Sequence, residues 1–267
     1  MKNLLKSIGY ILYYFAFQIL IQIILAKVVI GSGLITEADL LQWTIDNILL
    51  IITLSNLLSI SVLTLISKPI RSLLSREVLL KQVSFKEYLL PVMSAFSLSI
   101  FFTLITSGIE IENSVQISQS ATYFSQIRPW LGNVMMIVAL LISAPITEEF
   151  LCRGVIITLL RQNWSSTTAI LISALLFGGM HIMSGGLILA VLASLMGGLF
   201  GFIFVKTKSL LPAIAAHSAA NLSDFILPVI SQMNKATYVI ITIAFLIIFV
   251  MCMVPLCKDI KTSAYEE

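Results

Sequence analysis

Long runs of apolar residues, separated by short polar segments, extend through the whole chain. About 20 apolar residues in a helix are enough to cross the hydrocarbon core of a bilayer. Eight runs meet or approach this length, at about residues 8–30, 45–67, 88–108, 131–151, 168–184, 186–205, 210–230 and 237–256. The fifth and sixth are separated only by Ser184-Gly185-Gly186. The pattern predicts an all-α polytopic membrane protein with eight transmembrane helices, folded as a single transmembrane domain over residues 1–267.

The composition supports this class. Hydrophobic residues make up 58% of the 267 residues and charged residues only 11%. A soluble domain averages about 25% charged residues, so this chain has too few charges to cover a water-facing surface. The lipid bilayer is therefore the expected partner, and the net charge of +3 does not call for a nucleic acid. The three cysteines lie in apolar surroundings and imply no disulfide framework.

The basic residues predict the orientation of the chain. Eight spans place both termini on one side, and cytoplasmic loops are enriched in Lys and Arg. Thirteen of the 16 basic residues, Arg153 among them, fall on the side of the termini and of the loop 68–87. The polar loop 109–130 falls on the other side. We expect a multi-pass protein of the cell membrane with both termini cytoplasmic. The segment Lys68–Arg76 either only fixes this topology or lies on the inner leaflet as a basic amphipathic helix.

Three polar clusters interrupt the fourth, fifth and seventh runs, and the only two histidines of the chain lie in two of them. Ionisable groups within bilayer helices are costly, so they usually face the interior of a bundle and often mark a functional site. The three clusters fall within about seventy residues of one another. They therefore predict one polar site on the fourth, fifth and seventh helices.

The first cluster contains two adjacent carboxylates. Glu149 and Arg153 are four residues apart, so they share a helix face and can pair. Glu148 points about 100° away. One carboxylate can then be structural while the other acts as a general base. The alternative is an ordinary ion pair at the cytoplasmic end of the helix. Pro145, one turn earlier, predicts a kink that opens room for water.

The other two clusters contain the histidines. Phe177 and His181 are four residues apart in a segment of small residues, which let another helix approach closely in lipid. His217, Asn221 and Asp224 share one face of the seventh run. They either hydrogen-bond between helices or present an imidazole and an amide that stabilise an oxyanion. Asp224 is expected near the external interface.

Together the clusters offer groups suited to water activation and acyl-bond hydrolysis. Glu148, His181 and His217 also match a His₂Glu zinc set in residue type. The spacing of a zincin helix is missing, so we expect no metal, with Zn²⁺ at these three residues as the alternative. Their depths differ, because the fourth run ends near residue 151 while His181 lies about 20 Å into the membrane. Helix tilt, a later fifth helix or a longer fourth helix would reconcile them.

The three clusters resemble the motifs of the CAAX-type intramembrane proteases (CPBP family), which include Rce1-like prenyl-protein peptidases and bacterial bacteriocin-processing or immunity proteins. The family pattern is Glu-Glu-x-x-x-Arg, then Phe-x-x-x-His, then His-x-x-x-Asn. In this sequence it stands as Glu148-Glu149-Phe150-Leu151-Cys152-Arg153, Phe177 to His181, and His217 to Asn221. The motif-bearing core covers about residues 131–225.

The resemblance implies eight transmembrane helices with the site on the fourth, fifth and seventh. It implies that Glu148 activates water with help from His181, and that His217 and Asn221 stabilise the oxyanion. It further assigns shaping of the site or substrate binding to Glu149, Arg153 and Phe177. A glutamate-dependent, metal-free mechanism is favoured over a metal-dependent one by the motif spacing.

The residue usage resembles the bacterial branch of the family. We expect an intramembrane endopeptidase that hydrolyses a peptide bond of a membrane-associated peptide or protein. One alternative is a non-proteolytic bacteriocin self-immunity or sensor-regulating protein of the same fold. A small-solute transporter is another, although the chain lacks the internal repeats of many transporters. The oligomeric state is not predicted.

Overall fold

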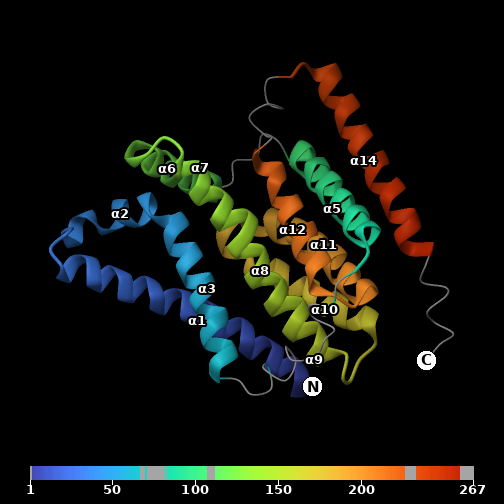
Figure 1. The fold of residues 1–267 in the computed structure, drawn as a ribbon, viewed down its shortest axis with the longest axis horizontal. Coiled ribbons are helices and arrows are strands. Elements are labelled where there is room, and N and C mark those ends of the chain that lie inside the picture. The colour runs from blue at the N-terminus through green and yellow to red at the C-terminus, as the bar shows by residue number, and fades with distance from the viewer. Residues whose placement is uncertain are drawn as a thin grey trace.

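The computed structural model describes residues 2–66, 70, 81, 83–106, 112–225 and 233–258. In these residues every regular element is helical and there is no β-strand. The helices pack against one another in a single bundle (Figure 1). The predicted all-α fold is confirmed. Cys152, Cys252 and Cys257 are all free thiols, as their apolar surroundings predict.

The helices follow one another without any intervening sheet. In chain order they are α1 (Lys2–Gly31), α2 (Leu40–Asp46), α3 (Ile48–Ile66), α5 (Phe85–Ile105), α6 (Glu112–Ile127), α7 (Leu131–Met136), α8 (Ala144–Glu149), α9 (Thr158–Leu160), α10 (Ser166–Met180), α11 (Ile182–Thr207), α12 (Leu210–Asn221) and α14 (Lys235–Lys258). Two π-helical segments, Ile137–Ser143 and Phe150–Ile157, join α7, α8 and α9. Short 3₁₀ turns cover Glu37–Asp39 and Leu222–Phe225.

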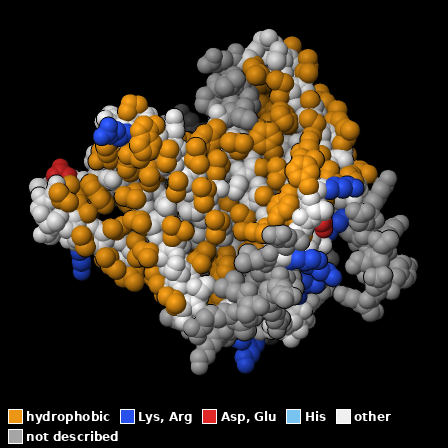
Figure 2. All heavy atoms as spheres, in the orientation of Figure 1, with side chains coloured by type: hydrophobic (Ala, Val, Ile, Leu, Met, Phe, Trp, Pro, Cys, Tyr) orange, Lys and Arg blue, Asp and Glu red, His pale blue; other side chains and the backbone are white. Residues whose placement is uncertain are grey.

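Six helices among the described residues are long and apolar enough to cross a membrane. They are Lys2–Gly31, Ile48–Leu65, Phe85–Ile105, Leu131–Leu160, Ile182–Thr207 and Lys235–Cys257. Apolar side chains cover most of the face in Figure 2, and charged groups lie mainly toward its edges. The protein is therefore a multi-pass membrane protein. Two predicted spans correspond to shorter helices, α10 with 15 residues and α12 with 12, so the count of eight stays a prediction.

The fourth span is longer than its hydropathy predicts. It continues to Leu160 instead of ending near residue 151. Glu149 and Arg153 pair within the helix, and the apolar sequence resumes after them. The predicted place of Arg153 on the cytoplasmic side is therefore wrong, because its side chain is fully buried. Glu148 lies near the middle of this helix, which removes the difference in depth from His181.

A break in the chain separates α10 from α11. His181 directly follows the last residue of α10, and Gly186 has a φ of +67°, a conformation that residues other than glycine rarely adopt. The two helices then pack closely. A β-carbon on Gly178 would lie 2.3 Å from the backbone oxygen of Ala190. The small residues before His181 therefore allow the close helix approach that the sequence predicts.

The structure describes one of the two long predicted loops and little of the other. The polar loop 109–130 contains a helix, α6, which packs against α2 and α7 and is not among the candidate spans, so its place outside the bilayer stays a prediction. The segment Lys68–Arg76 lies outside the described residues apart from Ile70.

At the end of the bundle away from α6, Asn3 Nδ2 donates to the Leu159 carbonyl oxygen at 2.8 Å. The start of α1 thus lies beside the end of the fourth span (Figure 1).

Candidate active site

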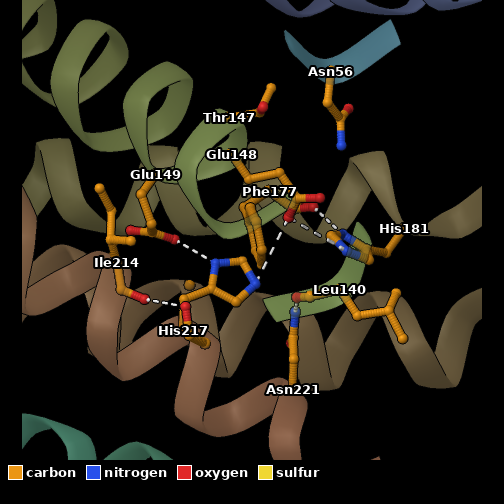
Figure 3. A network of polar contacts seen from close by, with 12 residues as sticks. Asn56, Leu140, Thr147, Glu148, Glu149, Phe177, His181, Ile214, His217 and Asn221 are labelled. Atoms are coloured by element: carbon orange, nitrogen blue, oxygen red, sulfur yellow. Dashed lines mark hydrogen bonds and ion pairs between the residues drawn. The ribbon is translucent and has the colours of Figure 1, made fainter. Parts of the chain in front are cut away.

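The helix that carries the two glutamates has unusual backbone geometry. Glu148 and Glu149 end α8, a short α-helical piece between two π-helical segments. π-helical turns are rare and occur frequently at functional sites. Figure 3 shows Glu148 and Glu149 facing His181 from α10 and His217 from α12. Residues that are separate in the sequence are thus brought together by three helices.

Glu149 is fully buried, and one of its two carboxylate oxygens makes both of its polar contacts. Its Oε1 accepts a hydrogen bond from His217 Nδ1 at 2.8 Å. The same oxygen forms an ion pair with Arg153 Nη1 at 2.9 Å. Arg153 is also fully buried, and its Nη2 donates to the Gly197 carbonyl oxygen at 2.8 Å. Glu149 therefore serves as the buried counter-charge that ties α8 to α12, the structural role that the sequence allows for one of the two carboxylates.

Aromatic rings enclose these polar groups. The Arg153 guanidinium carbon lies 4.7 Å from the centre of the Phe177 ring and 5.4 Å from that of Phe200. The His217 ring stacks on Phe200 at 4.7 Å with 16° between the planes. Phe177 also contacts both histidines, with ring centres 4.7 Å from His181 and 5.7 Å from His217. Phe177 therefore positions the histidines and the arginine together.

Glu148 lies between the two imidazoles. Its Oε2 is 3.8 Å from His217 Nε2 and 4.0 Å from His181 Nε2. These distances are too long for direct hydrogen bonds and short enough for a shared water molecule. The side chains of Glu148 and His181 are 15% and 25% exposed, in contrast to the buried Glu149. The residue that is free of Arg153 is thus the one that faces both histidines, as the sequence predicts.

The hydrogen-bond partners define the proton positions on both histidines. His181 Nδ1 lies 2.9 Å from the Phe177 carbonyl oxygen, and His217 Nδ1 lies next to the Glu149 carboxylate. Both partners only accept, so each Nδ1 carries a hydrogen and donates it. In the neutral rings both Nε2 atoms are then acceptors. Three acceptors, including the Glu148 carboxylate, thus face one another, and a bridging water molecule has hydrogens for two of them.

Asn221 forms a hydrogen bond to the fourth span. Pro145 has no N–H group, so the carbonyl groups one turn before it lose a donor. Asn221 Nδ2 donates to the Leu140 carbonyl oxygen at 2.9 Å, and Ser218 Oγ donates to that of Leu141 at 2.8 Å. This is the interhelical alternative that the sequence leaves open for Asn221. The side chain of the remaining residue in that predicted row, Asp224, lies outside the described residues.

Glu148, His181 and His217 are the residues that would hold a zinc ion. Zinc ligands about 2.0–2.1 Å from a tetrahedral ion lie about 3.4 Å from one another. The Glu148 oxygen is further than this from both Nε2 atoms, at 3.8 and 4.0 Å. Among the residues that the structure describes, no three His, Cys, Asp or Glu side chains group closely enough to hold a metal ion. The Glu148 oxygen thus lies further from both imidazoles than it would in a tetrahedral zinc site, and the absence of a metal stays a prediction.

The segment that contains all of these motif residues matches a known protein family. Residues 129–223 match the family model described as Type II CAAX prenyl endopeptidase Rce1-like. This segment is therefore similar to the CAAX-type intramembrane protease family. We call it the Rce1-like core (residues 129–223), and it covers a little over a third of the 267 residues. The resemblance predicted from the three motifs is confirmed, and the bacterial branch stays a prediction. No curated protein and no solved structure matches the chain.

One polar group near the Rce1-like core was missed by the sequence reasoning. Tyr14 and Gln18 from α1 both donate to the amide oxygen of Asn56 on α3, each at 2.9 Å. Figure 3 places Asn56 on the side of Glu148 opposite Asn221. Polar side chains in two otherwise apolar spans were the available signal. None of these side chains carries a charge, and none falls at the spacing of a known sequence motif.

Proposed function

We propose that this protein is an intramembrane endopeptidase that hydrolyses a peptide bond of a membrane-associated peptide or protein. One observation carries the proposal: a partly exposed carboxylate, Glu148, faces the Nε2 atoms of His181 and His217 at water-bridging distance inside a helix bundle. The match of the Rce1-like core to a family of endopeptidases supports the same reaction. We place the protein in the cell membrane with both termini in the cytoplasm, in keeping with its basic residues.

In the proposed reaction, Glu148 removes a proton from the bridging water, and His181 Nε2 accepts a hydrogen bond from the same water. The hydroxide oxygen bonds to the carbonyl carbon of the substrate, and the π electrons move to the carbonyl oxygen. The C–N bond then breaks as Glu148 returns its proton to the leaving nitrogen. The products are one carboxylic acid and one amine, and the two hydrogens that they gain both come from the attacking water, one of them through Glu148. No metal takes part.

In the same reaction, His217 acts beside the Glu148 carboxylate, from α12. In the proposed reaction its ring carries one hydrogen on Nδ1, which Glu149 accepts, and a second on Nε2. The Nε2–H of that ring is then a donor for the developing oxyanion. Asn221 Nδ2 has one hydrogen bonded to Leu140 and a second that remains for the same oxygen. These are the roles that the family resemblance implies for the two residues.

The proposed substrate class follows from the description of the matched family as a type II CAAX prenyl endopeptidase. We propose a substrate whose lipid group or apolar segment holds it in the bilayer. Glu148 lies near the middle of a 30-residue apolar helix, so the scissile bond must reach the interior of the bundle. A lipid-anchored peptide is concentrated at the membrane, where a soluble peptide is dilute.

The test uses the purified full-length protein in proteoliposomes. The probe is an internally quenched peptide that ends in a farnesylated Cys-aliphatic-aliphatic-Met motif, beside the same peptide without the farnesyl group. We expect cleavage of the farnesylated probe and a fall of about 10²–10⁴-fold for Glu148→Gln. Glu37→Gln, a glutamate in the turn after α1, is the matched control and should keep the wild-type rate. Equal cleavage by wild type and Glu148→Gln would refute the proposal.

A further inference from the structure

A polar group from α1 and α3 faces the site from outside the Rce1-like core. Asn56 is 2% exposed, and Tyr14, on α1, is 9% exposed. Tyr14 Oη and Gln18 Nε2 each donate to Asn56 Oδ1 at 2.9 Å. The two bonds therefore fix which way the Asn56 amide points, with its oxygen toward α1.

The amide nitrogen of Asn56 points the other way. Figure 3 shows it directed toward the side of the site where Glu148 and His181 lie. α3 packs directly against α8, the helix that carries Glu148. The hydrogen-bonded group of Tyr14, Gln18 and Asn56 therefore lies on the Glu148 side of the site.

This nitrogen has unused hydrogens. In the described part of the chain, both hydrogen bonds of the Asn56 side chain end on Oδ1, and Nδ2 donates none. An amide hydrogen without a protein acceptor is available to a group that enters the site. The groups that converge next to it are the Glu148 carboxylate and two imidazole nitrogens, which are all acceptors when the rings are neutral. Asn56 is thus a neutral, oriented donor beside a site that is rich in acceptors.

We propose that Asn56 donates a hydrogen bond from Nδ2 to the carbonyl oxygen of the scissile peptide bond and stabilises the oxyanion that forms there. This assignment rests on the proposed function. It adds to His217 and Asn221 a donor from α3, on the opposite side of Glu148 (Figure 3). Tyr14 and Gln18 are positioning residues, because they hold the amide oxygen and so aim the nitrogen.

If Asn56 only linked α1 to α3, it would need the same two hydrogen bonds. The variants must therefore separate this structural role from the proposed role as a donor. Asn56→Ala removes both the link and the donor. Tyr14→Phe weakens the link and keeps the donor. Asn47→Ala is the matched control on the same side of the bundle, because Asn47 precedes α3, is buried and donates only to the Trp43 carbonyl oxygen within the described residues.

The measurements are kcat and KM for the farnesylated probe, with the thermal midpoint of unfolding for each variant. We expect Asn56→Ala to lower kcat by about 10²–10³-fold, with KM within about threefold, as for loss of an oxyanion donor. Tyr14→Phe should lower kcat less, and Asn47→Ala should leave it unchanged. A fall in kcat for Asn56→Ala no larger than that for Tyr14→Phe would overturn the proposal, and so would a loss confined to KM.

A binding measurement separates this proposal from the proposed function. A peptide phosphinate with the residues of the probe carries a tetrahedral oxyanion in place of the scissile carbonyl. We expect its affinity to fall at least about 30-fold in Asn56→Ala, and equal affinity for both proteins would overturn the role of Asn56. Wild-type protein that does not cleave the probe would refute the endopeptidase function, while phosphinate binding would still report on Asn56.

Discussion

His217 Nδ1 lies 2.8 Å from Glu149 Oε1, and this hydrogen bond joins α12 to α8 inside the bundle. The adjacent carboxylate, Glu148, has no such bond and faces the Nε2 atoms of His181 and His217 instead. Two neighbouring residues with the same chemistry therefore have different environments. One is neutralised by Arg153 and buried, and the other remains available to water.

The two glutamates should respond differently to the same substitution. Glu149→Gln leaves the buried guanidinium of Arg153 without its counter-charge, which costs about 3–5 kcal/mol. Glu148→Gln leaves that ion pair intact. We expect a large fall of the thermal midpoint for Glu149→Gln and loss of hydrolysis with a near-native midpoint for Glu148→Gln. Thermal unfolding in detergent, followed by intrinsic fluorescence, measures both. Equal midpoints for the two variants would contradict the division of roles.

Close packing around Arg153 gives a second prediction. A β-carbon on Gly197 would lie 3.1 Å from Phe177 Cδ1, 3.2 Å from Ala174 Cα and 3.3 Å from Arg153 Nη2. A β-carbon on Gly198 would meet nothing within 4 Å. Gly197→Ala must displace the guanidinium or the helix, so we expect a loss of stability of about 1–3 kcal/mol.

The neighbouring glycine is the control for that change. Gly198→Ala should be neutral, or stabilise by up to about 1 kcal/mol, because alanine favours the helical backbone over glycine. Midpoints of thermal unfolding and the rate of probe cleavage are compared for both variants. A Gly197→Ala protein that matches Gly198→Ala in both measurements would show that α11 does not pack against Arg153 in this way.

The motif residues were predictable because their spacing is a property of one helix at a time. Four-residue spacing places Glu149 with Arg153, and Phe177 with His181, on one helix face. Rare ionisable groups in apolar spans then point to a shared interior. The end of the fourth span was not predictable in this way. A hydropathy window counts Glu149 and Arg153 as two charges, whereas the folded helix buries them as one neutral pair.

Asn56 and Asn221 show the other limit of the sequence. Asn56 is a single amide in an apolar span, and its direction is decided by Tyr14 and Gln18 on another helix. Asn221 was assigned through its motif. Its hydrogen bond to Leu140 depends on where α12 crosses the fourth span. Such contacts between helices distant in sequence carry no local periodicity, so only the fold reveals them.

The link between Asn221 and the fourth span can be measured with a double-mutant cycle. Pro145 cannot donate to the carbonyl group of Leu140, and Asn221 supplies that hydrogen bond. Asn221→Ala should cost about 1 kcal/mol or more, because a partly buried acceptor is left without a partner. With Pro145→Ala the backbone regains an N–H group, so the cost of Asn221→Ala should shrink by about 1 kcal/mol. Thermal unfolding of the four proteins gives this coupling, and strictly additive effects would contradict the pairing.

Chelation tests the metal-free reaction directly. The Nε2 atoms of His181 and His217 lie 4.0 and 3.8 Å from Glu148 Oε2, a spacing that suits a bridging water. We expect probe cleavage to persist within about twofold after exhaustive dialysis against 1,10-phenanthroline, because the base and the oxyanion donors are all protein groups. The preparation should hold far less than one equivalent of zinc by elemental analysis. Loss of cleavage that added Zn²⁺ restores, and that fails to return in His217→Ala, would instead assign Glu148, His181 and His217 as metal ligands.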